Sequence, residues 1–293
     1  MAVFDDERDR LFGLAYRMMG SVGDAEDIVQ EAWISWDASD RETIQNPAGF
    51  LTTVVTRRSL DRLRSAQHRR EEYPGPWLPE PMIEELDPAD SVVQAESLTL
   101  AFLGVLERLG PMERAVFLLH DVFDFSFGEV AEATGQTESA CRKMASRART
   151  RVHEAKPRYE LPGASTEELM GNLVGAVQAG DIETLLQLLD TNIEIHTDGG
   201  RKVHAAPRPI LGPHRAARFL VGVAAHQRGA SVELRAVNGE PGVIVSEENQ
   251  IVTVMSFTFA EGKLTAMRAI RNPDKLAYVA RQLAEGQSGS VDA

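Results

Sequence analysis

The first half of the chain carries its hydrophobic residues at helical spacing, whereas the last third alternates them at strand spacing. Leu11, Leu14, Ala15 and Met18 recur every three or four residues, which is typical of a helix with one buried face. Later segments instead alternate apolar and polar side chains. The sequence therefore predicts a helical region followed by an α+β region with a curved antiparallel sheet. The expected helices span 8–19, 24–36, 48–69, 90–109, 165–179 and 214–226, and the alternating segments span 193–198, 201–206, 231–239, 242–248, 251–259 and 264–272.

Residues 126–156 predict a helix-turn-helix whose second helix is basic. Ser126 and Glu129 form a capping box, Gly135 supplies the turn, and Thr137 can cap the second helix. A helix held by one apolar face, with cations on the other, suits the major groove of DNA. A solvated amphipathic helix is the alternative, but the capped first helix and the glycine turn favour DNA binding. The outward side carries Ser139, Arg142, Lys143, Ser146 and Arg147.

Composition narrows the class of protein. A chain of 293 residues that is 43% hydrophobic can form two or three domains with substantial cores. Its apolar runs are too short to span a bilayer, and the N-terminus lacks an apolar signal core. We therefore expect a cytoplasmic protein with no membrane partner. One cysteine excludes a disulfide framework and a cysteine-based zinc site, and we expect no metal and no cofactor.

The net charge of −13 is unevenly distributed. Arginines cluster over 57–70 and again in the second helix of the helix-turn-helix, whereas residues 71–107 contain acids and no Lys or Arg. Local clusters matter more than net charge for a nucleic-acid partner. We expect helical domains over 1–72 and 93–158, an acidic Pro-rich linker over 73–92, an α+β domain over 159–285 and a disordered tail over 286–293.

Three motifs resemble the extracytoplasmic-function (group IV) RNA polymerase sigma factors. DAEDIVQEAWISW (24–36) resembles the polymerase-binding helix of that family, and NPAGFLTTVVTRRSLDRLR (46–64) resembles the segment that reads the −10 promoter element. The stretch 106–152 resembles the −35-reading domain. The resemblance covers about residues 4–156. It implies two all-α sigma domains and an alternative sigma factor that directs core RNA polymerase to specific promoters.

The resemblance also implies roles for individual residues. On the second helix an acidic ridge faces a basic partner, which in the family is the clamp helices of the largest polymerase subunit; the flap of the second-largest subunit is a further expected partner. An acidic first turn favoured by the helix dipole is the alternative explanation of the ridge. The ridge consists of Asp24, Asp27 and Glu31, with Glu26 and Gln30 beside them. The expected promoter contacts are the amide of Asn46 on a melted base, Phe50 where the family often has Trp, and Arg57, Arg58 and Arg62 on phosphates.

The C-terminal part resembles a SnoaL-like α+β cone, a fold that encloses an apolar pocket and could hold an unknown small ligand. Sigma factors with this fused domain share three short signatures. The resemblance implies that these signatures take part in regulation of the sigma regions by the fused domain. We expect Trp77 to be docked, because an exposed Trp on a free linker is unfavourable. Arg201 stands where the family has Gly, although Arg resists the positive φ that Gly accepts. The signatures are Trp77-Leu78-Pro79-Glu80-Pro81, Asp198-Gly199-Gly200-Arg201-Lys202 and Asn272-Pro273-Asp274-Lys275-Leu276.

Two alternatives compete with a sigma factor. A helix-turn-helix regulator with a ligand-binding domain would not explain residues 24–36 or the arginines after Asn46. An enzyme is the second alternative, since His196 and Asp198 share one strand face, near His204 and His214, and could move a proton. Such residues are also ordinary before the turn at 199–200, and no nucleophile, metal cluster or phosphate loop accompanies them. We therefore predict no catalytic residues.

Overall fold

The computed structural model describes residues 2–71, 73–83, 97–155, 164–226 and 229–289. The chain divides into two compact units. The first, which we call the helical unit, comprises Met1–Glu72, Ser91–Ser97 and Phe102–Lys156. The second, the sheet unit, comprises Tyr73–Asp90, Leu98–Ala101 and Pro157–Ala293. The linker residues after Tyr73 thus group with the C-terminal fold.

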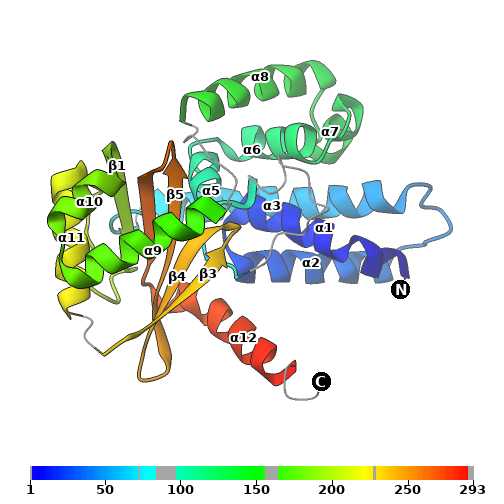
Figure 1. The fold of residues 1–293 in the computed structure, drawn as a ribbon. Coiled ribbons are helices and arrows are strands. Elements are labelled where there is room, and N and C mark those ends of the chain that lie inside the picture. The colour runs from blue at the N-terminus through cyan, green and yellow to red at the C-terminus, as the bar shows by residue number, and fades with distance from the viewer. Residues whose placement is uncertain (1, 72, 84–96, 156–163, 227–228, 290–293) are drawn as a thin grey trace. The chain divides into compact units, whose positions relative to one another are not determined.

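The helical unit contains the two predicted helical regions (Figure 1). Its first three helices pack on one another, and the helix-turn-helix follows a short π-helical turn. The described helices are α1 (Ala2–Met19), α2 (Val22–Asp37), α3 (Pro47–Glu71), α6 (Pro111–Phe117), η1 (Leu118–Val122), α7 (Phe127–Thr134) and α8 (Glu138–Ala155), while α5 (Leu100–Leu106) begins in the sheet unit.

Local signals set most of these helix ends. The capping box at Ser126 and Glu129 is confirmed, and Gly135 ends α7 in the left-handed conformation at φ 68°. Helix α2 begins before the expected start at residue 24, because Ser21 caps it by accepting from the Asp24 amide at 3.2 Å. The helix expected over 90–109 is interrupted by a bend at Thr99, after which α5 spans Leu100–Leu106; residues 84–96 lie outside the described residues.

The two helical regions, expected as separate domains, pack together in this unit. Buried Arg114 of α6 donates to the Met18 carbonyl at the end of α1 at 2.6 Å and pairs with Glu107 at 2.7 Å. Helix α3 also packs on α7, where Arg57 donates to the carbonyls of Glu132 and Ala133. These carbonyls lie at the C-terminal end of α7, which attracts cations.

The sheet unit is built on a six-stranded sheet in the order β2-β1-β6-β5-β4-β3. The expected all-antiparallel sheet is wrong in one place, because β1 and β6 run parallel. The segment 201–206, expected to alternate as a strand, forms turns and irregular structure instead. The elements are α9 (Ala164–Ala179), α10 (Ile182–Leu188), β1 (Leu189–Asp198), β2 (Ile210–Leu211), α11 (Pro213–His226), β3 (Ser231–Val237), β4 (Glu240–Glu247), β5 (Gln250–Ala260), β6 (Lys263–Ile270) and α12 (Pro273–Gly289).

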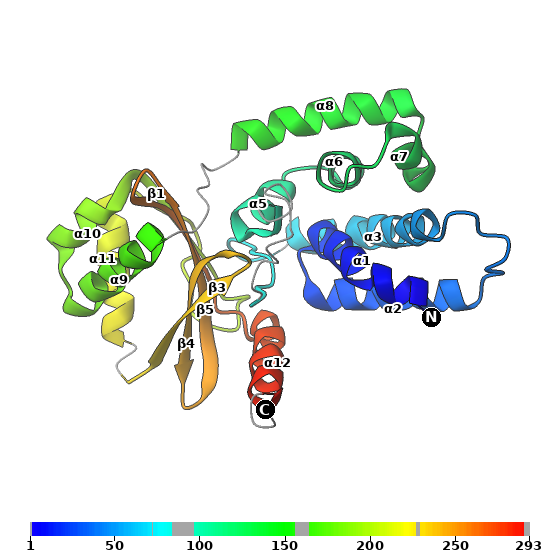
Figure 2. The same ribbon diagram turned by 45° about the vertical axis from the view of Figure 1, so that its right-hand side comes forward.

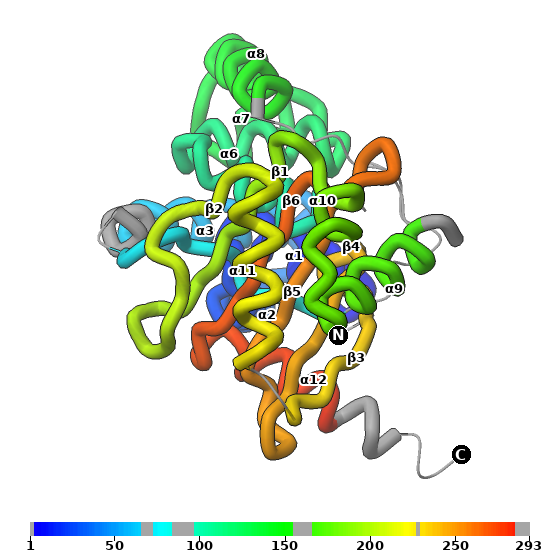
Figure 3. The backbone as a smooth tube through the Cα atoms, turned by 60° about the vertical axis from the view of Figure 1, so that its left-hand side comes forward, coloured from blue at the N-terminus to red at the C-terminus, as the bar shows by residue number. Residues whose placement is uncertain are grey.

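The two faces of this sheet have different neighbours. Helices α9, α10 and α11 cover one face, and α11 lies across β1, β6 and β5 (Figures 2 and 3). Helix α12 lies on the other face, against β5 (Figure 2). This helix was not predicted, and it continues to Gly289 through part of the expected disordered tail. Residues 290–293 of that tail lie outside the described residues.

Candidate functional site

Helix α8 presents the predicted basic face. Cys141, Met144, Ala145, Ala148 and Val152 are buried. The predicted outward residues are exposed, and Thr137 caps the helix by accepting from the Ala140 amide at 3.2 Å. Two of the expected DNA-binding cations are already paired on the surface: Arg142 with Glu138 at 2.5 Å and Arg147 with Glu113 at 3.2 Å. Phosphates would have to displace these ion pairs, of which the exposed pair of Arg142 with Glu138 has small net stability.

The predicted acidic ridge of α2 faces a predicted DNA-binding arginine of α3. Arg62 lies 3.2 Å from Asp24, 3.1 Å from Asp27 and 2.7 Å from Glu31. Burial alone would lower the pKa of Arg62, but the hydrogen bonds and charges of Glu31 and Asp27 outweigh it and raise that pKa. Arg58 adds a longer contact to Glu31 at 3.4 Å. The two predicted surfaces therefore meet, and their assigned roles remain predictions.

Asn46 has a structural role that the sequence analysis missed. Its side-chain oxygen accepts from the Gly49 amide at 3.0 Å, which makes it the N-cap of α3 ahead of Pro47. Gly49 leaves room for this cap, because a Cβ there would lie 2.7 Å from the Asn46 amide nitrogen and would force that side chain to shift. Phe50, one turn into the helix, is half-buried against Trp36 with ring centroids 6.0 Å apart. Both residues therefore stabilise this helix start.

In the sheet unit, the carboxylate of Asp198 holds the linker. Its side chain is 0% exposed at the end of β1. It accepts from the Tyr73 hydroxyl at 2.6 Å, the Leu78 amide at 3.0 Å, the Lys275 ammonium at 2.7 Å and the Gly200 amide at 3.1 Å. Four donors on one buried carboxylate satisfy its hydrogen-bonding capacity.

The ammonium of Lys275, on the first turn of α12, completes this arrangement. It lies 4.2 Å from the ring centroid of Trp77 and 5.0 Å from that of Tyr73, and it also donates to the Leu78 carbonyl. Aromatic faces stabilise a cation at such distances. Burial, and then the hydrogen bond to Asp198, raise the pKa of Tyr73 above its usual range, so its hydroxyl remains a donor. We name the linker clamp as Tyr73, Trp77 and Leu78 with Asp198, Asn272 and Lys275.

All three predicted signatures contribute to this region. Asn272 donates from its amide to the Tyr73 hydroxyl at 3.1 Å, and its backbone N–H donates to the Asp198 carbonyl at 3.0 Å. Gly200 allows close packing, because a Cβ there would lie 2.4 Å from the Asn272 amide nitrogen. Arg201 adopts φ 60° despite its side chain. One further residue from each of the two downstream signatures pairs at the surface, with Lys202 2.6 Å from Asp274, whereas Leu276 is buried.

Other residues that anchor the linker were missed by the sequence analysis. Asn238, in the turn between β3 and β4, accepts from the Met82 amide through its side chain and donates to the Met82 carbonyl from its backbone, both at 2.9 Å. Gln282 accepts from the Ile83 amide at 3.0 Å. The Asn238-Gly239 pair predicts a turn, but no local signal reveals that the turn binds a segment 156 positions away.

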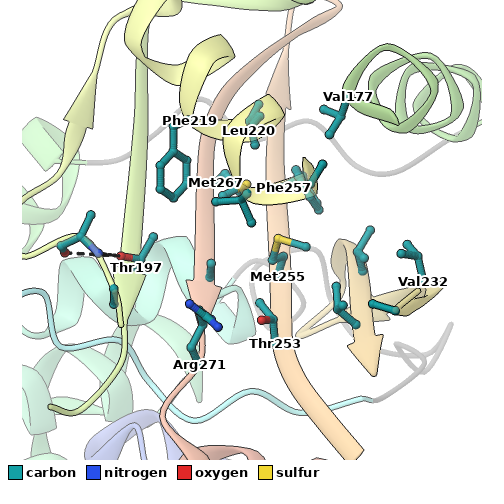
Figure 4. A pocket seen from close by; sticks show the side chains of 18 of the residues that line it. Val177, Thr197, Phe219, Leu220, Val232, Thr253, Met255, Phe257, Met267 and Arg271 are labelled. Atoms are coloured by element: carbon teal, nitrogen blue, oxygen red, sulfur yellow. Dashed lines mark hydrogen bonds between the residues drawn. The ribbon is translucent and has the colours of Figure 1, made fainter. Parts of the chain in front are cut away.

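The opposite face of the sheet encloses a cavity of about 370 Å³ between the strands, α9 and α11 (Figure 4). Thr197, His204 and Arg271 line it. The suggested proton-transfer pair does not: Asp198 is in the linker clamp, and His196 pairs with Glu194 at 3.0 Å. Within the described residues no group of three or more His, Cys, Asp or Glu could hold a metal ion. None of the helices in the described ranges is long and apolar enough to cross a membrane.

Comparison with known proteins identifies the family. Sigma-70 region 2 matches residues 3–69, and Sigma-70 region 4 matches residues 99–152. The ECF RNA polymerase sigma factor SigJ of Mycobacterium tuberculosis is 41% identical over 288 residues, which cover 93% of this chain and 91% of that protein. The chain belongs to the extracytoplasmic-function sigma factors. A second relative, the probable ECF sigma factor SigI of M. tuberculosis, is 30% identical over 97% of both chains.

The structure agrees with this family assignment. The crystal structure of M. tuberculosis SigJ superimposes with a TM-score of 0.76 at 37% identity, covering 94% of this chain and 98% of that one. The predicted fold class, two all-α sigma regions followed by a SnoaL-like α+β domain, is confirmed. This sigma factor therefore acts in promoter-specific transcription initiation, with core RNA polymerase and promoter DNA as partners. The match to region 2 rejects the simple helix-turn-helix repressor, and the relatives are sigma factors rather than enzymes.

Proposed function

We propose that this sigma factor is regulated by its SnoaL-like domain through the linker clamp. Regions 2 and 4 must lie at a separation that suits both promoter elements. A domain that captures part of the linker between them restricts that separation. The protein then exists in two states, with the linker captured or released. The balance between them sets the fraction of the protein that is competent to work with polymerase. The cytoplasm, where the polymerase acts, is the proposed location.

The buried pair of Asp198 and Lys275 carries this proposal. Two ions removed from water are retained only with good geometry and further hydrogen bonds. Here the further bonds come from the linker: Tyr73 and the Leu78 amide donate to the carboxylate, and the Leu78 carbonyl accepts from the ammonium. Linker release would therefore deprive a buried ion pair of partners. That cost favours capture.

We further infer how the sigma regions contact their partners. The acidic ridge of α2, with Asp24, Asp27 and Glu31 together with Glu26 and Gln30, would bind the basic clamp helices of the polymerase. Region 4 would contact the flap. The N-terminal part of α3, with Asn46 and Phe50, would face the melted −10 strand, and the exposed face of α8 would enter the −35 major groove. Because Arg62 already neutralises part of the ridge, a polymerase cation would compete with it.

Run-off transcription with purified core polymerase tests the regulation, using a promoter selected from genomic fragments by the wild-type holoenzyme. Lys275→Met and Trp77→Ala should each change the yield of transcript. If both act by releasing one clamp, the double variant should equal the stronger single variant. Lys202→Met is the matched control, because Lys202 forms an exposed pair with Asp274 in the same region.

Hydrogen exchange of residues 73–83 provides an independent measurement without polymerase. The amides of Leu78, Met82 and Ile83 are bonded to side chains of the sheet unit, so they should exchange slowly in the wild type. Lys275→Met should accelerate exchange at Leu78 in particular. Additive effects on transcription, or unchanged exchange at Leu78, would reject regulation through the clamp and leave the family assignment intact.

A further inference from the structure

We propose that the cavity of the SnoaL-like domain binds a small apolar monocarboxylate, with its carboxylate on Arg271 and Thr253 and its tail among the apolar side chains. We also propose that this ligand strengthens the linker clamp on the opposite face of the sheet. The second step rests on the proposed regulation by the linker clamp; the first does not.

The size and lining of the cavity favour such a ligand. Its volume of about 370 Å³ lies in the usual range of small-molecule sites. At ~30 Å³ for each water-sized group, it accommodates on the order of twelve non-hydrogen atoms. Phe219, Leu220, Val177 and Met267 are among its apolar lining residues. The tail therefore corresponds to a chain of about eight to ten carbons, or to a small ring system of the same volume.

One end of the cavity is polar and carries hydrogen-bonding atoms that are unused. In Figure 4 Arg271 and Thr253 lie toward one end, and Phe219 and Leu220 lie toward the other. The register of β5 and β6, in which Val254 pairs with Ile270, places Thr253 and Arg271 opposite each other when it is continued by one residue. In the described structure the Thr253 hydroxyl and the Arg271 Nε are both buried without a hydrogen-bond partner.

These two groups select the chemistry of the ligand. Thr253 is 3% exposed, and a buried polar atom without a partner costs free energy. A carboxylate can accept from a guanidinium N–H with one oxygen and from a hydroxyl with the other. The described lining contains Arg271 and His204 but no Asp or Glu, which favours an anion over a cation. A ligand without oxygen would leave both donors unpaired.

At two places in the chain, one residue lines the cavity and the next belongs to the linker clamp. Thr197 lines the cavity, and the next residue, Asp198, holds the linker; Arg271 lines the cavity, and the next residue, Asn272, bonds Tyr73. In addition, the backbone N–H of Arg271 donates to the Asp198 carbonyl at 2.7 Å. A ligand that immobilises Arg271 would therefore immobilise the backbone that positions the clamp carboxylate.

Calorimetric titration of the full-length protein tests the site with octanoate and decanoate at pH 7, where both acids are ionised. Saturable binding of at least one acid is expected, and octan-1-ol, which lacks the charge, should bind more weakly than octanoate. Arg271→Gln should weaken binding by roughly tenfold to a hundredfold, as expected for loss of a hydrogen bond to a charged group. Arg208→Gln, an exposed change that does not line the cavity, is the control.

Thr253→Val separates a binding role from a structural one. Valine has nearly the shape of threonine, and the hydroxyl has no partner in the described structure, so the ligand-free protein should unfold at the same or a higher urea concentration. Acid binding should nevertheless weaken. The site is refuted if neither acid binds saturably, or if octan-1-ol binds as tightly as octanoate and Arg271→Gln changes neither affinity.

Hydrogen exchange tests the coupling. Saturating decanoate should slow exchange of the Leu78 amide in the wild type. Unchanged or faster exchange, with binding intact, would overturn the coupling. It would not affect the clamp itself, which the Lys275→Met measurement tests in the absence of any acid.

Discussion

Replacing Lys275 by Met is the sharpest perturbation of the linker clamp. Methionine keeps an unbranched apolar chain beside Trp77 and removes the ammonium. Lys275 is 6% exposed and the Asp198 side chain is 0% exposed, so the substitution leaves a buried carboxylate without its counter-charge. Removing one partner of a buried ion pair costs about 3–5 kcal/mol. The matched exposed pair of Lys202 and Asp274 should contribute about 0–1 kcal/mol.

Urea unfolding followed at equilibrium measures both costs. Lys275→Met should lower the free energy of unfolding by about 3–5 kcal/mol, whereas Lys202→Met should lower it by less than about 1 kcal/mol. The slope of the free energy of unfolding against urea concentration should remain unchanged if release of the linker does not unfold the domain. Because the chain has several domains, the transition must be assigned by exchange of peptides from the sheet unit.

A double-mutant cycle isolates the charge interaction. Asp198→Asn keeps the shape but replaces one acceptor by a donor, which opposes either the Leu78 amide or the Tyr73 hydroxyl. The single substitutions should each destabilise the sheet unit, and the double variant should be less destabilised than their sum by about 0.5–3 kcal/mol. Strict additivity would show that the pair does not interact in solution. The buried ion pair could then no longer explain why the linker is captured.

Three further predictions concern separate contacts. Tyr73→Phe should reduce alkaline sensitivity. Because the folded-state pKa of Tyr73 is raised, the contribution of Tyr73 to stability is complete below about pH 10 and declines progressively as the pH rises toward the folded-state pKa. In urea unfolding the wild type but not Tyr73→Phe should therefore begin to lose this contribution at about pH 10.5 compared with about pH 8. Asn46→Ser retains an N-cap but lacks the amide, so it should keep the stability that Asn46→Ala loses. Promoter opening by the serine variant is measured with permanganate, and opening equal to that of the wild type would show that the amide contacts no base. Arg62→Met should strengthen polymerase binding in a fluorescence titration if it competes for Glu31, and weakened binding would show that it positions the ridge instead.

Signals confined to a few residues were predictable from the sequence. The capping box at Ser126, the turn at Gly135 and the buried stripe of α8 all depend on contacts within four residues. Even locally, one helix start was misplaced: α2 begins after Ser21 rather than at residue 24, because both Ser and Asp cap helices and the spacing of apolar residues does not distinguish them.

Contacts between distant segments were not predictable in the same way. The signatures around Trp77, Asp198 and Lys275 suggested a common role, but only the parallel pairing of β1 with β6 brings Asp198 beside the start of α12. That pairing was not expected, since adjacent strands in the sequence suggested antiparallel order. Tyr73 and Asn238 were missed because the sequence around each gives no sign of a bonding partner so far along the chain.

The helical unit uses some of the same cations for internal packing that promoter DNA would require. Arg57 of α3 donates to the last carbonyls of α7, and its guanidinium cannot simultaneously bind a phosphate with those N–H groups. Arg114, in contrast, is 2% exposed and satisfied by backbone carbonyls and Glu107, so DNA cannot recruit it. Packing between regions 2 and 4 therefore combines one buried anchor with a more exposed contact. Because phosphate binding is favoured by counterion release, we expect a phosphate to compete for Arg57 first, whereas any separation of the two regions must also break the buried contacts of Arg114.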